Sequence, residues 1–377
     1  MDTLCKISII FVLIILNTPW LSDALGFKEP HPLHGESTEL KAPQFSIDDL
    51  LCGEFTKGVD DYSRTNFLLR AMAIRSRNEI DYSLFSERHA RSVIMGKDGY
   101  LFEENYVLAA LGLDLLEEGV VSSRVSALSE LSEKTGVPFL VVLAPGKGSY
   151  FRNYLPEDYL ALESVKKSVN ENALYESWSE EMVKSGMSVL DLFDFFNLDG
   201  EVFPKNGIHW SEWVQVDAIN MISDHLRDLL PDSLRPARLI IDSSYRSNEM
   251  RGTDDDIEKG LNLWRDIEDL EATYYETHWE EVLDEERPRI LVMGDSYAWG
   301  LVNKGLLRDG YKDSEFWFYN KGVHGPRIEL QGASPEHVHG FNDIAGFEGV
   351  VSQFDAVILL STDANLSRFP FNFGYVK

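Results

Sequence analysis

Basic residues are scarce in this sequence of 377 residues, which holds 35 Lys and Arg against 63 Asp and Glu and carries a formal net charge of −28. Proteins that bind nucleic acid neutralise phosphates with clustered Lys and Arg, so the shortage of cations argues against a nucleic-acid partner. The same negative charge disfavours a strongly anionic polymer as ligand. A neutral or mildly charged partner is therefore expected.

Cysteine is nearly absent, since the chain contains only Cys5 and Cys52. Two cysteines are too few for a disulfide framework, and neither stands at the spacing of a metal site. We expect no structural disulfide, no metal and no cofactor.

The chain also lacks an apolar run long enough to span a membrane comfortably. The run Ile7 to Leu16 follows Lys6 and has the length of a signal-peptide core, but it is short for a transmembrane span. Ser22-Asp23-Ala24 offers a small-x-small cleavage site. Residues 1–24 are therefore predicted to be a signal peptide or a retained signal anchor. Either role places the protein in the periplasm or elsewhere outside the cytoplasm. A retained signal anchor would attach it to the inner membrane.

What the chain does contain is enough apolar sequence for a packed core, with 44% hydrophobic and 12% aromatic residues. Residues 25–90 are predicted to be a linker followed by a helical extension. Residues 91–377 are predicted to be one domain, and Lys97-Asp98-Gly99 near its start indicates a hairpin. Continuous apolar runs alternate with helical segments there, which is typical of a parallel sheet buried on both faces. The expected fold is a three-layer α/β/α sandwich with a mainly parallel sheet, and the acidic stretch 242–286 is expected to be irregular and helical. The predicted strands lie within 137–145, 187–193, 289–297, 314–320 and 355–362.

The stretch RILVMGDSY places Ser296 directly after a predicted strand. Ligands of open parallel sheets bind beyond the carboxyl ends of the strands, so Ser296 stands where a nucleophile is expected, although Gly-Asp-Ser also forms ordinary turns. A serine needs a base to remove its proton, and histidine is the usual one. His209, in FPKNGIHWSEW, follows turn residues and precedes a predicted helix, which suits a base; its alternative role is to cap that helix or stack on Trp210.

Four motifs occur in the order MGKDGYLF, VVLAPGKGSYF, GIHWS and VMGDSY, between about Ser92 and Ser361. In this order and rough spacing they resemble the SGNH-hydrolase-like alginate O-acetyltransferases of the AlgJ/AlgX type. The ending STDANLSRFPFNFGY and the PLHG linker are similar to a branch common in Bacteroidetes-type bacteria. The resemblance implies an SGNH-like fold, with Ser296 as nucleophile and His209 as base.

The chain departs from this family in one place. The family's histidine motif is usually Asp-x-His-Trp, with the acid orienting the imidazole, whereas this chain has Gly207 at that position. Either another carboxylate substitutes or the triad is broken. Asp363, just past the strand within 355–362, is the candidate acid. Asp191 and Asp194 are weaker candidates.

Further site residues follow from the same motifs. The N–H of Ser296 and the APGKGS loop are candidate donors to an oxyanion, and Lys147 in that loop is predicted to contact a sugar or an acetyl donor unless it is simply solvated. Trp210 is a candidate for stacking on a sugar, and His324 in NKGVHGPR is a further binding candidate. Asp295 is expected to form the turn rather than to serve as the triad acid, because adjacent side chains diverge.

Three functions remain open at this stage. The first is a cell-envelope polysaccharide O-acetyltransferase that forms an acyl-enzyme on Ser296 and receives acetyl from a membrane-bound O-acyltransferase partner. The second is a non-catalytic SGNH-like subunit that binds polysaccharide within an exopolysaccharide modification or export complex. The third is an extracellular carbohydrate esterase. Gly207 favours the second, whereas the presence of both Ser296 and His209 favours the other two.

Overall fold

The computed structural model describes residues 3–26, 32–35, 40–67, 69–85, 92–165, 173–193, 201–267, 270–319, 322–325, 347–371 and 373. It divides the chain into two compact units. The first comprises residues 1–91 with 258–268, and the second comprises 92–257 with 269–377. The predicted signal segment 1–24 and extension 25–90 both fall in the first unit, and His209 and Ser296 fall in the second.

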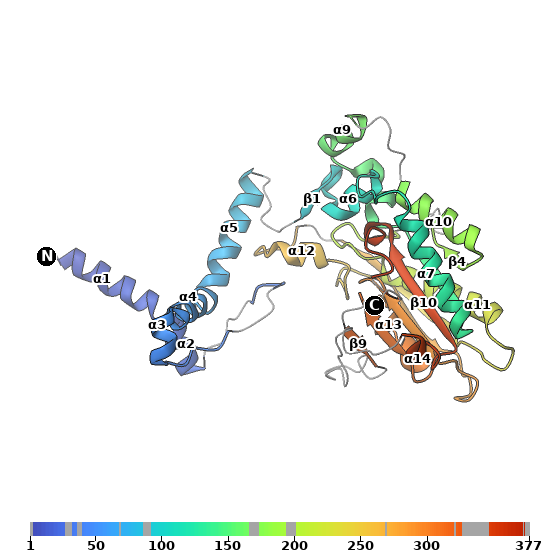
Figure 1. The fold of residues 1–377 in the computed structure, drawn as a ribbon. Helices are drawn as coiled ribbons and strands as arrows, with labels where there is room; N and C mark the ends of the chain where they lie inside the picture. The colour runs from blue at the N-terminus through green and yellow to red at the C-terminus, as the bar shows by residue number, and fades with distance from the viewer. Residues whose placement is uncertain are drawn as a thin grey trace. The chain divides into compact units, whose positions relative to one another are not determined.

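The first unit is helical (Figure 1). Ser46 caps one helix by accepting a hydrogen bond from the Asp49 N–H, and Gly53 ends it in the left-handed conformation with φ 88°. Tyr62 is buried, donates to the Pro19 carbonyl and packs its ring 4.7 Å from that of Trp20. Among the described residues, no helix combines the length and the apolarity needed to cross a bilayer. The helices are α1 (Thr3–Leu16), α2 (Thr18–Leu25), α3 (Ile47–Cys52), α4 (Glu54–Thr65) and α5 (Arg70–Phe85).

The second unit is built on a six-stranded sheet in the order β4-β3-β10-β7-β8-β9. All neighbouring strands run parallel except β8 and β9, which pair antiparallel at the edge. Strands β3, β7 and β10 are buried along their whole length, because helices cover both faces. The strands are β3 (Phe139–Ala144), β4 (Ser188–Asp191), β7 (Ile290–Gly294), β8 (Glu315–Phe318), β9 (Gly322–His324) and β10 (Ala356–Thr362).

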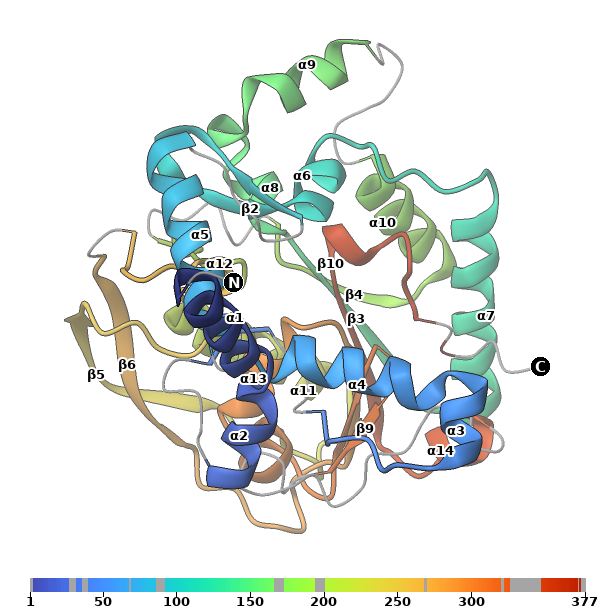
Figure 2. The same cartoon turned by 90° about the vertical axis from the view of Figure 1, so that its left-hand side faces the viewer.

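Helices pack on both faces of this sheet. Alternate strand residues such as Val141, Met293 and Leu359 form one core with α7 and α10, and the residues between them, such as Val142 and Leu360, are buried on the opposite face. Figure 2 shows α7 on one side of the strands and α11 and α13 on the other. The predicted three-layer α/β/α sandwich with a mainly parallel sheet is confirmed. The helices and the short hairpin of this unit are β1 (Val93–Met95), β2 (Leu101–Glu103), α6 (Glu104–Ala110), α7 (Val120–Thr135), α8 (Lys147–Tyr150), α9 (Glu157–Val165), α10 (Ala173–Ser185), α11 (Glu212–Leu229), α13 (Ala298–Asn303) and α14 (Phe347–Val351).

The stretch expected to be irregular and helical instead contains two long strands. β5 (Leu239–Ser247) and β6 (Ala272–Trp279) pair antiparallel into a ribbon, and the short helix α12 (Asp256–Leu261) lies between them in the chain. Most of the ribbon's residues are partly or fully exposed. Because exposed strands carry polar side chains on both faces, they lack the continuous apolar run that marks the central sheet. The prediction for 242–286 was therefore wrong for residues 242–247 and 272–279, which are strands, whereas helix α12 agrees with it.

Candidate active site

The carboxyl ends of the parallel strands meet at one edge of the sheet and carry the sequence motifs. β7 leads into Gly294-Asp295-Ser296, β10 leads into Asp363, and β3 leads into Pro145-Gly146-Lys147. This is the edge where open parallel sheets bind ligands. Ser296 therefore lies at the position that the sequence predicts for it.

The turn that carries Ser296 is fixed by its neighbour Asp295. This buried carboxylate accepts four hydrogen bonds, from the Tyr297 N–H at 3.0 Å, the Thr362 N–H and hydroxyl at 2.8 Å each, and the Asn365 side chain at 2.9 Å. Buried carboxylates are tolerated when hydrogen bonds satisfy them in this way. Asp295 thus ties the turn after β7 to the end of β10, as expected of a turn-former.

The loop that carries His209 is held from two sides. The buried Tyr297 hydroxyl donates to the Ile208 carbonyl at 2.8 Å, so the residue next to Ser296 is bonded directly to the residue before His209. Lys147 also contacts this loop, and its Nζ donates to the carbonyls of Lys205 and Gly207 at 2.7 Å each. Burial raises the pKa of Tyr297 well above its usual value, which keeps the hydroxyl proton in place to donate.

A carboxylate contacts the histidine ring, and it belongs to Asp256. Asp256 Oδ2 lies 2.6 Å from His209 Nδ1, and Oδ1 accepts the Ile208 N–H at 2.9 Å. A carboxylate can only accept here, so the neutral imidazole carries its proton on Nδ1 and leaves a lone pair on Nε2. Among the described residues, Nε2 has no hydrogen-bond partner although it is buried. This arrangement leaves Nε2 as a buried atom that can accept a proton.

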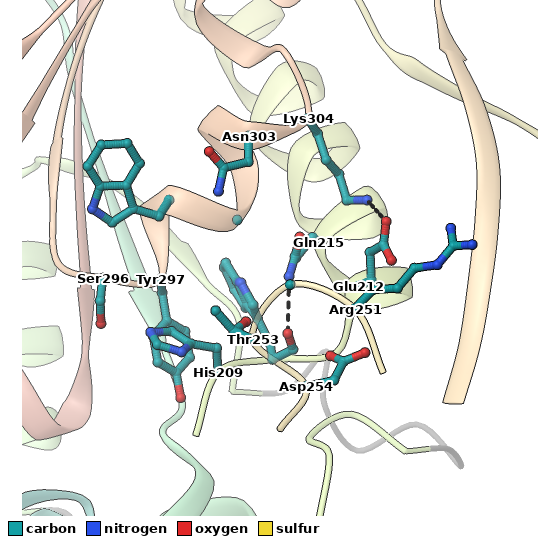
Figure 3. Close-up of a pocket in the computed structure, with 14 residues that line it drawn as sticks. His209, Glu212, Gln215, Arg251, Thr253, Asp254, Ser296, Tyr297, Asn303 and Lys304 are labelled. Carbon is teal, nitrogen blue, oxygen red and sulfur yellow. Dashed lines mark hydrogen bonds and ion pairs between the residues drawn. The ribbon is translucent and has the colours of Figure 1, made fainter. Parts of the chain in front are cut away.

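His209 and Ser296 line one pocket (Figure 3). One wall comes from the loop 251–254, and the other comes from α13 and the residue after it. Lys304 forms an ion pair with Glu212 at 3.0 Å, and the exposed Arg251 guanidinium lies over the rings of Tyr245 and Tyr274 at 5.3 and 5.2 Å. The lining residues are His209, Trp210, Glu212, Gln215, Arg251, Gly252, Thr253, Asp254, Ser296, Tyr297, Trp299, Gly300, Asn303 and Lys304.

The structure places Asp363 away from the histidine ring. Its Oδ1 accepts the N–H groups of Gly146 and Ala364 at 2.9 and 2.7 Å, and its Oδ2 accepts the hydroxyl of Ser149. Burial raises the pKa of the Asp363 carboxyl to about 7, against the opposing effect of these hydrogen bonds. Asp363 thus joins the ends of β10 and β3. The place beside the His209 ring, which the sequence analysis assigned to Asp363, is occupied by Asp256. Asp191 accepts from the Tyr175 hydroxyl and the Phe193 N–H, and Asp194 lies outside the described residues.

Three predicted binding residues have different surroundings from those expected. Lys147 is fully buried and does not line the pocket, so it holds the His209 loop rather than contacting a ligand. Trp210 lines the pocket but is fully buried, with its ring 5.2 Å from that of Tyr297, which leaves no open face for a sugar. His324 packs 5.0 Å from the ring of Trp299, and Trp299 itself faces the pocket.

Sequence reasoning missed the wall formed by Arg251, Thr253 and Asp254, together with Asp256. These residues lie in RGTDDDIEKG, and a run of acids is typical of a solvated surface. Asp254 is instead buried and accepts from the Tyr274 hydroxyl at 2.7 Å, and burial raises its pKa to about 7. The one available signal was the missing acid at Gly207, which indicated that a carboxylate was needed but not where it came from.

No protein-family model matches the chain, and no curated protein matches it. Among solved structures, it is similar to the O-acetyltransferase domain of Pseudomonas putida AlgJ, with 14% identity, coverage of 73% of this chain and 92% of that one, and a TM-score of 0.44. It is also similar to Pseudomonas aeruginosa AlgX, with 12% identity, coverage of 75% of this chain and 67% of that one, and a TM-score of 0.46. A third similar structure is Bacillus cereus PatB1 with a sulfonyl adduct, with 12% identity, coverage of 74% of this chain and 99% of that one, and a TM-score of 0.44. The first two are of the type that the sequence motifs resemble.

Proposed function

We propose that this protein transfers acetyl groups to hydroxyl groups of a cell-envelope polysaccharide through an acyl-enzyme on Ser296. The observation that carries the proposal is the state of His209. Its Nδ1 is bonded to a carboxylate, and its buried Nε2 has no partner among the described residues, in a pocket that also contains a serine at a strand end. A base that is bonded to an acid, with a hydroxyl in the same pocket as the base, is what nucleophilic acyl transfer requires.

In the first half-reaction, the Ser296 oxygen attacks the acetyl carbonyl of the donor while its proton passes to His209 Nε2. The bond between the carbonyl carbon and the donor oxygen then breaks, and the His209 proton goes to that leaving oxygen. In the second half-reaction, a sugar hydroxyl attacks the Ser296 acetyl ester, and His209 takes the proton from the sugar and returns it to Ser296. Water in place of the sugar gives acetate, which is the esterase reaction.

The pocket walls support a sugar as acceptor. Arg251 and Asn303 are exposed, and together with Thr253 they offer polar groups that suit hydroxyls. Trp299 is partly exposed and takes the stacking role that the sequence suggested for Trp210. We assign these residues to acceptor binding.

The alternative, a non-catalytic polysaccharide-binding subunit, rested on the absence of an acid at Gly207. The carboxylate of Asp256 on His209 Nδ1 removes that reason. The catalytic proposal is therefore the better supported of the two.

Location and partner belong to the same proposal. We assign the protein to the periplasm, anchored to the inner membrane by α1, where exposed apolar side chains such as Ile7 and Ile10 would lie in lipid. A membrane-bound O-acyltransferase would supply the acetyl group there. Fractionation of cells tests the location: recovery in the cytoplasmic fraction would overturn it, and release from membranes by a salt wash alone would overturn the anchor.

Hydrolysis of p-nitrophenyl acetate by the purified full chain tests the chemistry. We expect Ser296→Ala and His209→Ala each to remove activity above the uncatalysed rate. Ser352→Ala and His278→Ala, at exposed positions outside the pocket, should retain it. Adding neutral or uronate oligosaccharides then separates transfer from hydrolysis, because a transferase yields acetylated sugar in place of acetate. Activity that survives both pocket substitutions would refute the nucleophile.

A further inference from the structure

The segment between α11 and β7 builds the part of the site that the sequence motifs do not cover. After β5, residues 251–254 line the pocket, and α12 then begins at Asp256. The chain continues into β6, which pairs antiparallel with β5. The position of residues 251–254 is fixed by Tyr274 of β6, whose hydroxyl donates to Asp254 and accepts the Arg251 N–H at 3.0 Å. The ribbon therefore holds the loop that bears Asp256.

Gly207 and this loop compete for the same space. A Cβ atom at residue 207 would lie 2.4 Å from the Thr253 carbonyl oxygen and 2.7 Å from that of Asp254. Contacts of this kind are shorter than any that real Cβ atoms make, and both are to backbone. An acidic side chain two residues before His209 and the loop 253–256 in its present place are mutually exclusive.

We propose that Asp256 is the positioning residue for His209, and that Gly207 is glycine because the loop that delivers Asp256 occupies the space of a side chain there. This rests on the proposed function of Ser296 and His209. The acid thus comes from a segment far along the chain rather than from the histidine motif itself.

The geometry favours Asp256 over the other groups near the ring. Its two oxygens bond His209 Nδ1 and the Ile208 N–H, so one carboxylate sets both the tautomer of the ring and the direction of the backbone that bears it. Glu103, at the end of β2, is the second carboxylate that faces His209, and burial and the neighbouring Asp256 raise its pKa. Lys147 is the nearby amine, and it donates to the carbonyl of Gly207. Neither Glu103 nor Lys147 bonds the imidazole, and only Asp256 does so among the described residues.

Kinetics and proton NMR of the full chain test the proposal together. We expect Asp256→Asn to lower kcat for acetyl-ester hydrolysis by about 10²- to 10⁴-fold with little change in KM, because an amide at this position favours the wrong tautomer. Formate should restore part of the activity of Asp256→Ala, because the shortened side chain leaves room for a small carboxylate. It should not restore the activity of Asp256→Asn. Asp255→Asn, which makes the same change in charge one residue earlier, is the matched control and should stay within about threefold of the parent.

The NMR readout does not depend on turnover. A deshielded Nδ1 proton should be present in the parent and in Asp255→Asn, and absent from His209→Ala and Asp256→Asn. If the parent shows this proton but no more activity than Ser296→Ala, the proposed function fails and the role of Asp256 stands. If Asp256→Asn keeps both the proton and the activity, or if Glu103→Gln removes the proton instead, the role of Asp256 is overturned.

The part of the proposal that concerns Gly207 has its own test. Gly207→Asp should fail to restore activity to Asp256→Ala, and Gly207→Ala alone should lower both stability and kcat, because either side chain displaces the loop. A double variant Gly207→Asp/Asp256→Ala with near-parent activity would show that the two sites do not compete.

Discussion

Lys147 is a fully buried amine whose pKa is lowered well below its usual value by burial, and its Nζ donates to two carbonyls of the His209 loop. Replacing it with Met, which fills similar space, leaves the carbonyls of Lys205 and Gly207 without that donor. The Lys205 carbonyl still accepts the Leu101 N–H at 3.1 Å, so the loss falls on the Gly207 carbonyl. An unsatisfied buried carbonyl costs about 1–3 kcal/mol, and removal of a buried amine offsets part of this cost. We expect Lys147→Met to lower the free energy of unfolding by about 1–3 kcal/mol and to reduce kcat more than it raises KM. Urea unfolding and steady-state kinetics measure both effects, with Lys97→Met at an exposed ion pair as control. An unchanged kcat would contradict the role given to Lys147.

Asp363 should make stability depend on pH. Its folded pKa of about 7 lies above the ordinary value of 3.8, so the folded protein binds more protons than the unfolded chain between these values. Stability is then highest at low pH and falls as the pH rises through this window. Between pH 5 and 8, we expect Asp363 to remove about 2–3 kcal/mol from the free energy of unfolding. The raised pKa of Asp254 acts with the same sign.

The Asp363→Asn variant isolates this contribution. The Asn oxygen can still accept from Gly146 and Ala364, and its amide can donate to the Ser149 hydroxyl, so the local bonding is kept without a titrating group. Urea unfolding at several pH values should give a flatter profile for the variant than for the parent. Parallel profiles would contradict the raised pKa of Asp363.

At the scale of elements, the β5–β6 ribbon is expected to act on the site through Tyr274. In Tyr274→Phe the ring stays, but Asp254 loses a donor and the Arg251 N–H loses its acceptor. We expect a loss of about 1–2 kcal/mol in stability and a decrease in kcat of about 3- to 10-fold, because the loop that carries Asp256 is held less firmly. Tyr275→Phe, on the opposite face of the same strand, is the matched control and should change neither. Equal effects of the two substitutions on kcat would argue against coupling through the loop.

The elements also show how far the sequence could be interpreted alone. β3, β7 and β10 are buried on both faces and were predicted from continuous apolar runs, and the same runs placed Ser296 at a strand end. The exposed β5–β6 ribbon gives no such run and was missed. Asp256 was missed for a different reason: its contact with His209 spans 47 residues, and its neighbours Asp254 and Asp255 make it resemble solvated surface. Which acid replaces the one absent at Gly207 depends on tertiary packing, which local sequence patterns do not report.

At the scale of the whole molecule, the two units are interleaved in sequence, because residues 258–268 of the first are inserted between two parts of the second. Within the first unit, α5 holds this segment. Asn78 and Arg75 donate to the carbonyls of Leu261 and Leu263 at 2.8 and 2.7 Å, and Glu79 pairs with Arg265 at 2.8 Å. Helix α12 begins at Asp256 in the second unit and ends in this segment. The acid on His209 is therefore joined through a short helix to a segment that α5 anchors.

Two shortened chains test this connection. A chain that starts at Asn17 lacks α1 but keeps α2 on Tyr62 and keeps α5, so it should retain the melting temperature and kcat of the parent. A chain that starts at Ser92 keeps every strand of the central sheet but removes the α5 side chains that donate to the carbonyls of Leu261 and Leu263. We expect it to melt several degrees lower and to lose about tenfold or more in kcat, because α12 frays and Asp256 no longer holds the imidazole in one orientation. Calorimetry and acetyl-ester hydrolysis measure both chains, and formate should not restore the shorter one, whose carboxylate is present but displaced. If the chain from Ser92 matched the parent in kcat, the position of Asp256 would depend on the β5–β6 ribbon alone and α5 would have no part in the site.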